Sequence, residues 1–446
     1  MNILFIRPYY GINVNGDMGG DLGIVDYSSQ ITPDLSIIYS ASLAKKYGIT
    51  VDVRDCNAEK KYVKELLATL QGKKYEYIIV KAAAPSVKLD IKLCRILKRL
   101  GIGDRIVLAG HVAKILKEWI VENVSEIDEV PDTSMENYVF QNILKQNRDV
   151  CMNDFPVPCY ADFPFDTYND GERKIGYLWS SKGCNLRCSY CPYYFFYGKK
   201  IDNRDISMVI DDIQYMISLG INYIQFRDPF FTNNRQRILE LCNTIIDKNI
   251  QFEWFCETRI DTIDAEVAEA MYRAGCRCVA FGVENADLEI LKKYSRPVYE
   301  LKKAIGNVEI LKQYGIKTLA FYMVGFPEDT YESVTDTYKI AEKINTDYAQ
   351  FNVFTLYSDT EMYSTKVTPD FFIPCENMTN INACKALSRG ELVNIVEVFR
   401  ANYSFMRLGL RHCIKEKEQG MLLKKRAVSI FNNQSQILDS IWNIKE

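Results

Sequence analysis

The chain has 446 residues, of which 48% are hydrophobic and 25% are charged, enough for roughly two or three domains with large cores. Its 55 basic and 58 acidic residues nearly balance, with a net charge of -3, which argues against a nucleic-acid-binding surface. No apolar run has the length of a membrane span, and the start turns polar too early for a signal peptide. The 14 cysteines are mostly scattered singly, which favours reduced thiols in the cytoplasm.

Residues 1–150 alternate short apolar strands with helical stretches. The pattern predicts a Rossmann-like α/β domain, a doubly wound parallel sheet with helices on both faces. Ligands of such folds bind beyond the carboxyl ends of the strands, here followed by loops at 8–23, 81–86 and 110–112. Strands are expected at Ile3–Ile6, Thr50–Arg54, Tyr77–Val80, Ile106–Ala109 and Glu126–Val130, and helices at Leu35–Tyr47, Lys61–Leu70, Ser86–Leu100 and Ala113–Val121.

Three cysteines form the most informative motif. Cys184, Cys188 and Cys191 are spaced C-x3-C-x2-C, just after an apolar strand expected at Ile175–Trp179. Three thiolates hold three irons of a cubic 4Fe-4S cluster and leave one iron open to a small chelating molecule, whereas a purely electron-transferring cluster takes four. The alternatives are buried thiols, or a zinc site completed by a distant ligand, although a zinc ribbon usually brings a second C-x2-C pair.

This motif, with Tyr190 before its last cysteine, resembles that of the radical S-adenosylmethionine (SAM) superfamily. The resemblance implies a metal site at Cys184, Cys188 and Cys191, where one electron from the cluster cleaves SAM into methionine and a 5′-deoxyadenosyl radical. It also implies an external one-electron reductant of the flavodoxin or ferredoxin type, and a small-molecule substrate.

The superfamily uses a partial (β/α)6 barrel, and the region 171–365 contains the six strand–helix units that such a barrel needs. In such barrels the loops at the carboxyl ends of the strands carry the chemistry. Besides Ile175–Trp179, strands are expected at Tyr223–Phe226, Phe252–Cys256, Cys278–Phe281, Thr318–Val324 and Tyr348–Phe354, and helices at Ile206–Leu219, Arg235–Lys248, Asp264–Arg273, Leu301–Tyr314 and Tyr331–Glu342.

The same resemblance implies SAM contacts at the ends of these strands. Glu284 offers acceptors for a ribose hydroxyl or the methionine ammonium, unless it is an acid that caps the next helix. Arg259 has a fork suited to the SAM carboxylate, or it forms an interdomain ion pair. The expected contacts in the barrel are Tyr190, Asp228, Arg259, Gly282, Glu284, Val324 and Gly325.

The front domain resembles the cobalamin-binding domain that precedes many radical SAM enzymes. The resemblance rests on the helix that begins near Pro33, the strand end at Asp55-Cys56 and the Ala109-Gly110-His111 turn. Two departures leave a Rossmann-like domain without ligand as the alternative: residues 130–136 replace the usual Gly-Glu-Gly-Glu segment, and an Asp-x-His-x-x-Gly motif is absent. Cobalamin contacts are expected at Ala84, Ser86, Gly110 and His111.

The predicted organisation is a front domain at 1–150, a proline-rich linker at 151–170, the barrel at 171–365 and a C-terminal helical region at 366–446 with an amphipathic helix at Ser388–Met406. The resemblance implies a cobalamin-dependent radical SAM methyltransferase that acts on an unactivated carbon of a natural-product or lipid-like molecule. The alternatives are a non-methylating, cobalamin-free dehydratase, epimerase or cyclase, and a non-enzymatic redox or zinc-binding scaffold. No residue is singled out as a catalytic acid, base or hydrogen donor.

Overall fold

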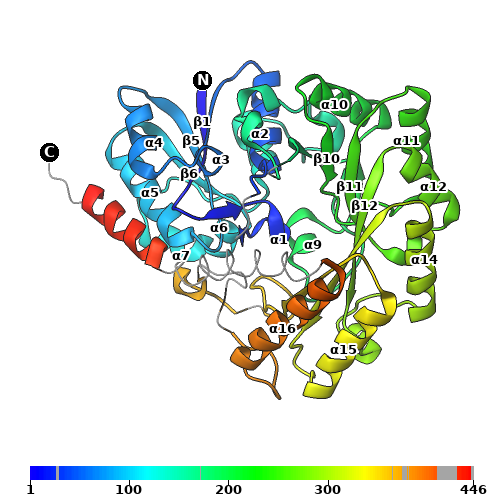
Figure 1. Cartoon of the computed structure of the whole chain (residues 1–446). Helices are drawn as coiled ribbons and strands as arrows, with labels where there is room; N and C mark the ends of the chain where they lie inside the picture. Colours follow the sequence, from blue (N-terminus) through cyan, green and yellow to red (C-terminus); the bar gives the residue numbers. More distant parts are fainter. Residues whose placement is uncertain are drawn as a thin grey trace.

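Two parallel sheets stand side by side, each covered by helices (Figure 1). The computed structural model describes residues 1–442 except 27–29, 171, 364, 374–378, 380 and 409–428. The front sheet lies in the blue and cyan part of the chain and the second sheet in the green and yellow part. The α/β fold class predicted from the sequence is confirmed.

The front sheet has the strand order β4-β1-β5-β6, all parallel. The stretches Ile3–Ile6, Ile78–Val80 and Ile106–Ala109 are apolar and fully buried, as expected of a parallel sheet covered on both faces, whereas the edge strand β4 alternates apolar and charged residues and is only half-buried. The strands are β1 Asn2–Arg7, β4 Thr50–Asp55, β5 Tyr75–Lys81 and β6 Gly103–Ala109, and the main helices are α2 Leu35–Lys46, α4 Val63–Leu70, α5 Val87–Arg99, α6 His111–Ile115 and α7 Lys117–Asn123.

The prediction of a fifth strand at Glu126–Val130 is wrong. Only one parallel bridge, between Val107 and Glu129, joins this segment to β6. The reason lies in Asp128, whose side chain accepts a hydrogen bond from the Ile106 N–H at 2.7 Å. A carboxylate therefore takes a backbone donor that a paired strand would have used, and the ladder stops.

A small unit that the sequence analysis did not predict follows β1. The antiparallel strands β2 Asn13–Asn15 and β3 Ile24–Asp26 flank a four-residue turn of helix, α1 Met18–Asp21. Gly19 and Gly20 within it have φ values of 63° and 69°, a left-handed conformation that glycine adopts without steric cost. The elements are too short for hydrophobic periodicity to reveal them.

The second sheet contains six parallel strands in the order β14-β13-β12-β11-β10-β7, so every strand neighbours the next one in sequence. This is the open barrel that the sequence analysis predicted. The strands are β7 Ile175–Leu178, β10 Tyr223–Phe226, β11 Glu253–Thr258, β12 Cys276–Glu284, β13 Lys317–Val324 and β14 Tyr348–Val353. The covering helices are α10 Ile206–Ser218, α11 Arg235–Asp247, α12 Ala265–Arg273, α14 Leu301–Gln313 and α15 Tyr331–Ile344, with shorter helices at α9 Pro192–Tyr197 and α13 Leu288–Lys293.

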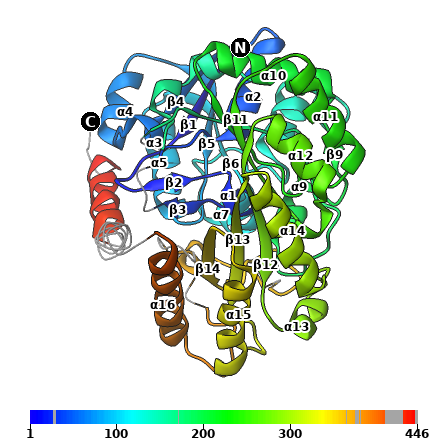
Figure 2. The same cartoon turned by 45° about the vertical axis from the view of Figure 1, so that its right-hand side comes forward.

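The C-terminal region reaches back across the molecule. Helix α16 spans Arg389–Leu408, so its bounds are within two residues of the predicted Ser388–Met406. It packs beside β14. Residues 429–442 form another helix that lies along α5 of the front domain in both views (Figures 1 and 2), where Asp439 pairs with Lys92 at 2.6 Å. The helical region predicted from residue 366 onward is wrong for its first part, because the described residues between 366 and 388 contain only the 3-10 turn Pro369–Phe371. Residues 409–428 and 443–446 of the region lie outside the described residues. Among the described helices, none is both long and apolar enough to cross a bilayer.

Candidate active site

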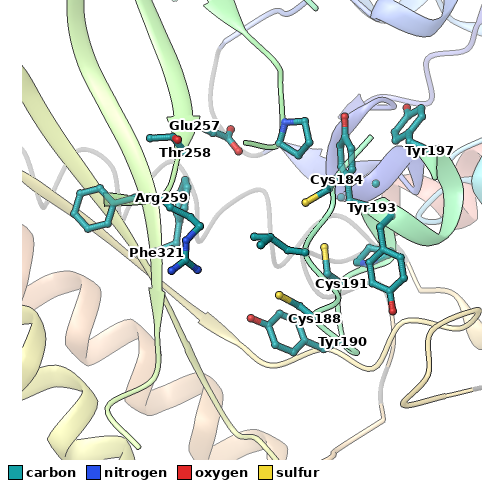
Figure 3. Close-up of a pocket in the computed structure, with 18 of the residues that line it drawn as sticks. Cys184, Cys188, Tyr190, Cys191, Tyr193, Tyr197, Glu257, Thr258, Arg259 and Phe321 are labelled. Atoms are coloured by element: carbon teal, nitrogen blue, oxygen red, sulfur yellow. The ribbon is translucent and has the colours of Figure 1, made fainter. Parts of the chain in front are cut away.

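A cavity of about 300 Å³ lies where the carboxyl ends of the barrel strands face α1 of the front domain. Figure 3 shows the thiols of Cys184, Cys188 and Cys191 pointing into it, with Arg259 directed toward them from the opposite side. The cavity lies at the position where barrel and sheet folds of this kind place their ligands.

Backbone packing shapes the loop that carries the cysteines. Gly183 has a φ of 88°, and a Cβ there would collide with the Lys200 carbonyl oxygen. The Cys184 N–H donates to the Gly198 carbonyl at 3.2 Å, which ties the loop to the segment after α9. Cys191 caps α9, and Pro192 takes the first helical position, where its missing N–H costs nothing. The loop is thereby closed, with its three thiols on the inner side.

Asp228 holds the start of this loop. Its carboxylate accepts hydrogen bonds from the Ser180 N–H at 2.8 Å and from the Ser180 and Ser181 hydroxyls, each at 2.6 Å. The side chain is buried and does not line the cavity. The structure therefore places Asp228, which the sequence analysis proposed as a SAM contact, behind the cluster loop.

The donor set fits the cluster that the motif implies. Cys184 and Cys188 are 8% and 4% exposed, and no other described cysteine besides Cys191 joins them at the cavity. Burial raises the pKa of Cys184, and that of Cys191 to about 12, so these thiols need a positive charge to become thiolates. The Arg296 guanidinium lies 3.9 Å from the Cys188 sulfur and supplies one. Three thiols with a nearby cation suit a cluster that keeps one iron free of protein ligands.

Glu284 turns into the same cavity through an irregular strand end. Its φ of 74° lies in the left-handed region, and the register between β12 and β13 shifts between Gly282 and Glu284. A Cβ on Gly282 would collide with the Glu284 carboxylate, so glycine is what allows the side chain to fold over the strand. Such strain in a non-glycine residue is typical of functional sites.

Arg296 pairs with this carboxylate. Its Nη2 lies 3.1 Å from Glu284 Oε1 and donates to the Gly282 carbonyl at 2.9 Å. Burial raises the pKa of Glu284, while Arg296 counteracts that rise. A buried ion pair thus faces the cavity beside Cys188. Arg296 was not predicted from the sequence, because it follows α13 in a stretch without a strand end or a motif.

The other residues expected to contact SAM divide into two groups. Tyr190 and Arg259 line the cavity; the Tyr190 hydroxyl is buried with no partner among the described contacts, whereas the Arg259 fork is engaged by Asp261 at 2.9 and 2.8 Å. Val324 and Gly325 do not line it. Their backbone groups are bonded elsewhere in the barrel. The assignment of these residues as SAM contacts stays a prediction.

The front domain supplies the part of the cavity wall beside α9, which was not predicted from the sequence. Asp17 reaches the cavity next to Gly19 and Gly20 of α1. Its Oδ1 is buried without a partner among the described residues, and burial raises the pKa of Asp17 to about 6. Arg227 and Glu257 of the barrel, which form an ion pair at 2.8 Å, also line the cavity. The cavity therefore has an anchored cluster corner and a polar wall with an unsatisfied acceptor.

The four residues expected to contact cobalamin, Ala84, Ser86, Gly110 and His111, do not line this cavity. They lie at the carboxyl edge of the front sheet, where the chain itself covers them. The Ala84 N–H donates to the Leu22 carbonyl at 2.6 Å, and the Ser86 hydroxyl is bonded to Asp90 at 2.9 Å.

His111 is fully buried by the same covering segment. Its Nδ1 lies 2.8 Å from the Gly20 carbonyl, and its ring stacks on Phe196 of α9 with centroids 4.5 Å apart. Beside it, Lys81 and Asp21 form a buried ion pair. With α1 in this position, Ala84 and His111 contact the covering segment, and this arrangement does not fit a corrin at the edge.

Residues 180–341 match the model of the Radical SAM superfamily. The chain is 27% identical over 279 residues to the uncharacterized methyltransferase PH0819 of Pyrococcus horikoshii, an alignment that covers 61% of each chain. It is 28% identical over 225 residues to the anaerobic magnesium-protoporphyrin IX monomethyl ester cyclase of Rubrivivax gelatinosus, covering 48% of this chain and 40% of the cyclase.

A solved structure shares the arrangement of both sheets. The radical S-adenosylmethionine methyltransferase TsrM from Kitasatospora setae, with cobalamin and a [4Fe-4S] cluster bound, superposes with a TM-score of 0.60 over 81% of this chain and 76% of TsrM, at 15% identity. At that identity the likeness concerns the fold. The chain spans about three-fifths of PH0819 and two-fifths of the cyclase.

Proposed function

Because residues 180–341 of this chain are a radical SAM domain, we propose that the protein is a radical SAM enzyme that binds a 4Fe-4S cluster through Cys184, Cys188 and Cys191. The observation that carries the proposal is the set of three thiols that face one cavity without a fourth cysteine among the described residues. When bound, the cluster supplies the electron that cleaves SAM into methionine and a 5′-deoxyadenosyl radical.

The chain's own residues bind and orient SAM beside the cluster. Glu284 accepts hydrogen bonds from the SAM ribose or ammonium, and the positive charge of Arg296 opposes the rise in the pKa of Glu284 that burial causes. The unpartnered Tyr190 hydroxyl offers a further polar contact within the cavity. Walls from both domains exclude water, which protects a radical from side reactions.

For the transformation itself we propose methyl transfer to an unactivated carbon of a small molecule, natural-product or lipid-like, by a cobalamin-dependent methyltransferase. The support is the methyltransferase name of PH0819 and the fold shared with TsrM, whose structure contains cobalamin. We place the enzyme in the cytoplasm, because oxygen-sensitive clusters and single free thiols both need a reducing compartment.

A second candidate has its own support. The segment that covers Ala84, Ser86, Gly110 and His111 favours a cobalamin-free, non-methylating radical SAM enzyme, and the named cyclase is a relative outside the methyltransferases.

Two measurements on anaerobically reconstituted protein test these proposals. With dithionite and SAM, the protein should form 5′-deoxyadenosine; a cluster-loaded sample that forms none contradicts the radical SAM assignment. Incubation with hydroxocobalamin followed by gel filtration separates the two candidates. A retained corrin absorbance supports methyl transfer, and its absence supports the second candidate.

A further inference from the structure

The surface over the cluster loop carries cations without counterions. Arg187, Lys199 and Lys200 are exposed, and the sequence from Asn185 to Lys200 contains no acidic residue. None of the three forms an ion pair with another described residue; Lys199 only lies over the ring of Tyr194, 5.2 Å from its centroid. In a chain with more acids than bases, this is a local excess of positive charge.

This basic corner lies next to the three thiols. Arg187 directly precedes Cys188 in the chain. The segment with Lys199 and Lys200 is bonded to the cluster loop through the Cys184 N–H, which donates to the Gly198 carbonyl at 3.2 Å. Cys184 and Cys188 are buried and Cys191 is partly buried, so the exposed side chains of this corner are the charged surface next to the loop that carries the thiols.

Nearby lysines show that the excess is confined to this corner. The Tyr294 carbonyl at the end of α13 accepts a hydrogen bond from the Ser189 N–H, which places α13 against the cluster loop. Lys292 pairs with Glu289 at 2.7 Å and Lys293 pairs with Glu328 at 2.5 Å. Paired charges contribute little net field, whereas unpaired cations attract an acidic partner.

We propose that Arg187, Lys199 and Lys200 form the docking surface for a small acidic protein that carries one electron, an inference that rests on the radical SAM function proposed above. The docked carrier is oxidised by one electron, and SAM takes up that electron as its S–C5′ bond breaks. Redox partners of this kind form small, transient interfaces, so charge complementarity mainly sets the rate of encounter.

The test compares two reductants on the reconstituted holoenzyme. Initial rates of 5′-deoxyadenosine formation are measured with an acidic flavodoxin, reduced enzymatically, and separately with dithionite. The double variant Lys199→Glu/Lys200→Glu should lower the flavodoxin-driven rate about 10-fold at low salt, because steering changes association rates by at least that factor. The difference should shrink as salt screens the charges, and the dithionite-driven rate should not change.

A matched control carries the same change in charge elsewhere. Lys248 and Lys312 are exposed at the carboxyl-terminal ends of α11 and α14, so Lys248→Glu/Lys312→Glu should keep both rates. The docking proposal is overturned if the corner variant keeps its flavodoxin-driven rate, if it loses both rates equally, or if flavodoxin drives no reaction in the wild type while dithionite does. Failure of the wild type with dithionite overturns the proposed function, and this inference with it.

Discussion

The cluster corner of the barrel and the carboxyl edge of the front sheet occupy equivalent positions, yet they are built in opposite ways. At the barrel corner, the buried hydroxyl of the cavity-lining Tyr190 has no hydrogen-bond partner among the described residues. At the front edge, Lys81 pairs with Asp21 and the His111 ring is bonded and stacked. An open edge with unsatisfied groups indicates a ligand site, whereas a closed edge shows that a Rossmann-like sheet can keep its topology while the chain occupies its binding face.

Helix α1 connects the two regions. It covers the front edge through the Gly20 carbonyl and Asp21, and it presents Asp17 to the barrel cavity. Contact with α9 places it directly against the helix that follows the cluster cysteines (Figure 1). Movement of α1 would therefore change both sites at once.

The largest loss of activity is expected from a substitution at the cluster corner of the barrel. Cys188→Ala removes one of three cluster ligands, so 5′-deoxyadenosine formation with dithionite should fall to background. Cys278→Ala serves as the control, because Cys278 is a half-buried thiol in β12 that does not line the cavity. Deoxyadenosine formation at the wild-type rate by the Cys188 variant would show that this corner is not the cluster site.

A smaller loss is expected when the ion pair is broken. Arg296→Ala leaves the Glu284 carboxylate buried without its cation, which should raise the pKa of Glu284 further. A hydrogen bond to a charged group contributes roughly 1.5–3 kcal/mol, so SAM affinity measured by equilibrium dialysis should fall about 10- to 100-fold. The loss should deepen as the pH falls, since protonated Glu284 no longer attracts the ammonium. Arg296→Lys should keep part of the affinity; equal loss in both variants without any pH dependence would contradict the role.

A third, smaller effect is expected at the closed edge of the front sheet, where the free energy of unfolding should depend on pH. Asp90 is fully buried, bonded to Tyr10 and Ser86, and burial raises its pKa to about 7. Between about pH 4 and 7 the native chain therefore binds more protons than the unfolded chain, so stability falls as pH rises. A difference of one pKa unit between the folded and the unfolded chain corresponds to about 1.4 kcal/mol in the free energy of unfolding.

Urea unfolding of Asp90→Asn across this range should show a flatter pH profile than the wild type. Asp247→Asn, at an exposed site at the end of α11, should keep the wild-type slope. An unchanged slope in the Asp90 variant would mean that this carboxyl group is hydrated and that the edge is open.

Local sequence signals predicted most of the elements. The second strand of the barrel, Tyr223–Phe226, has the expected bounds, and the other barrel strands differ by a few residues at their ends. The prediction of a fifth strand in the front sheet failed because the Asp128 carboxylate accepts the hydrogen bond of the Ile106 N–H. The pattern of hydrophobic residues does not reveal such a competition. Helix α1 was missed because its Gly-Gly turn lacks any period.

The spacing of Cys184, Cys188 and Cys191 and the alternation of strands and helices were enough to determine a three-thiol site at the end of a barrel strand, because both are encoded within short stretches of chain. Which other groups reach that site was decided by tertiary structure alone. Asp17 lies far from the cysteines in sequence, and Arg296 meets Glu284 only through the irregular end of β12. Likewise, the front edge is closed by α1 and α9, since the occupancy of a surface depends on packing between distant segments, which no local pattern records.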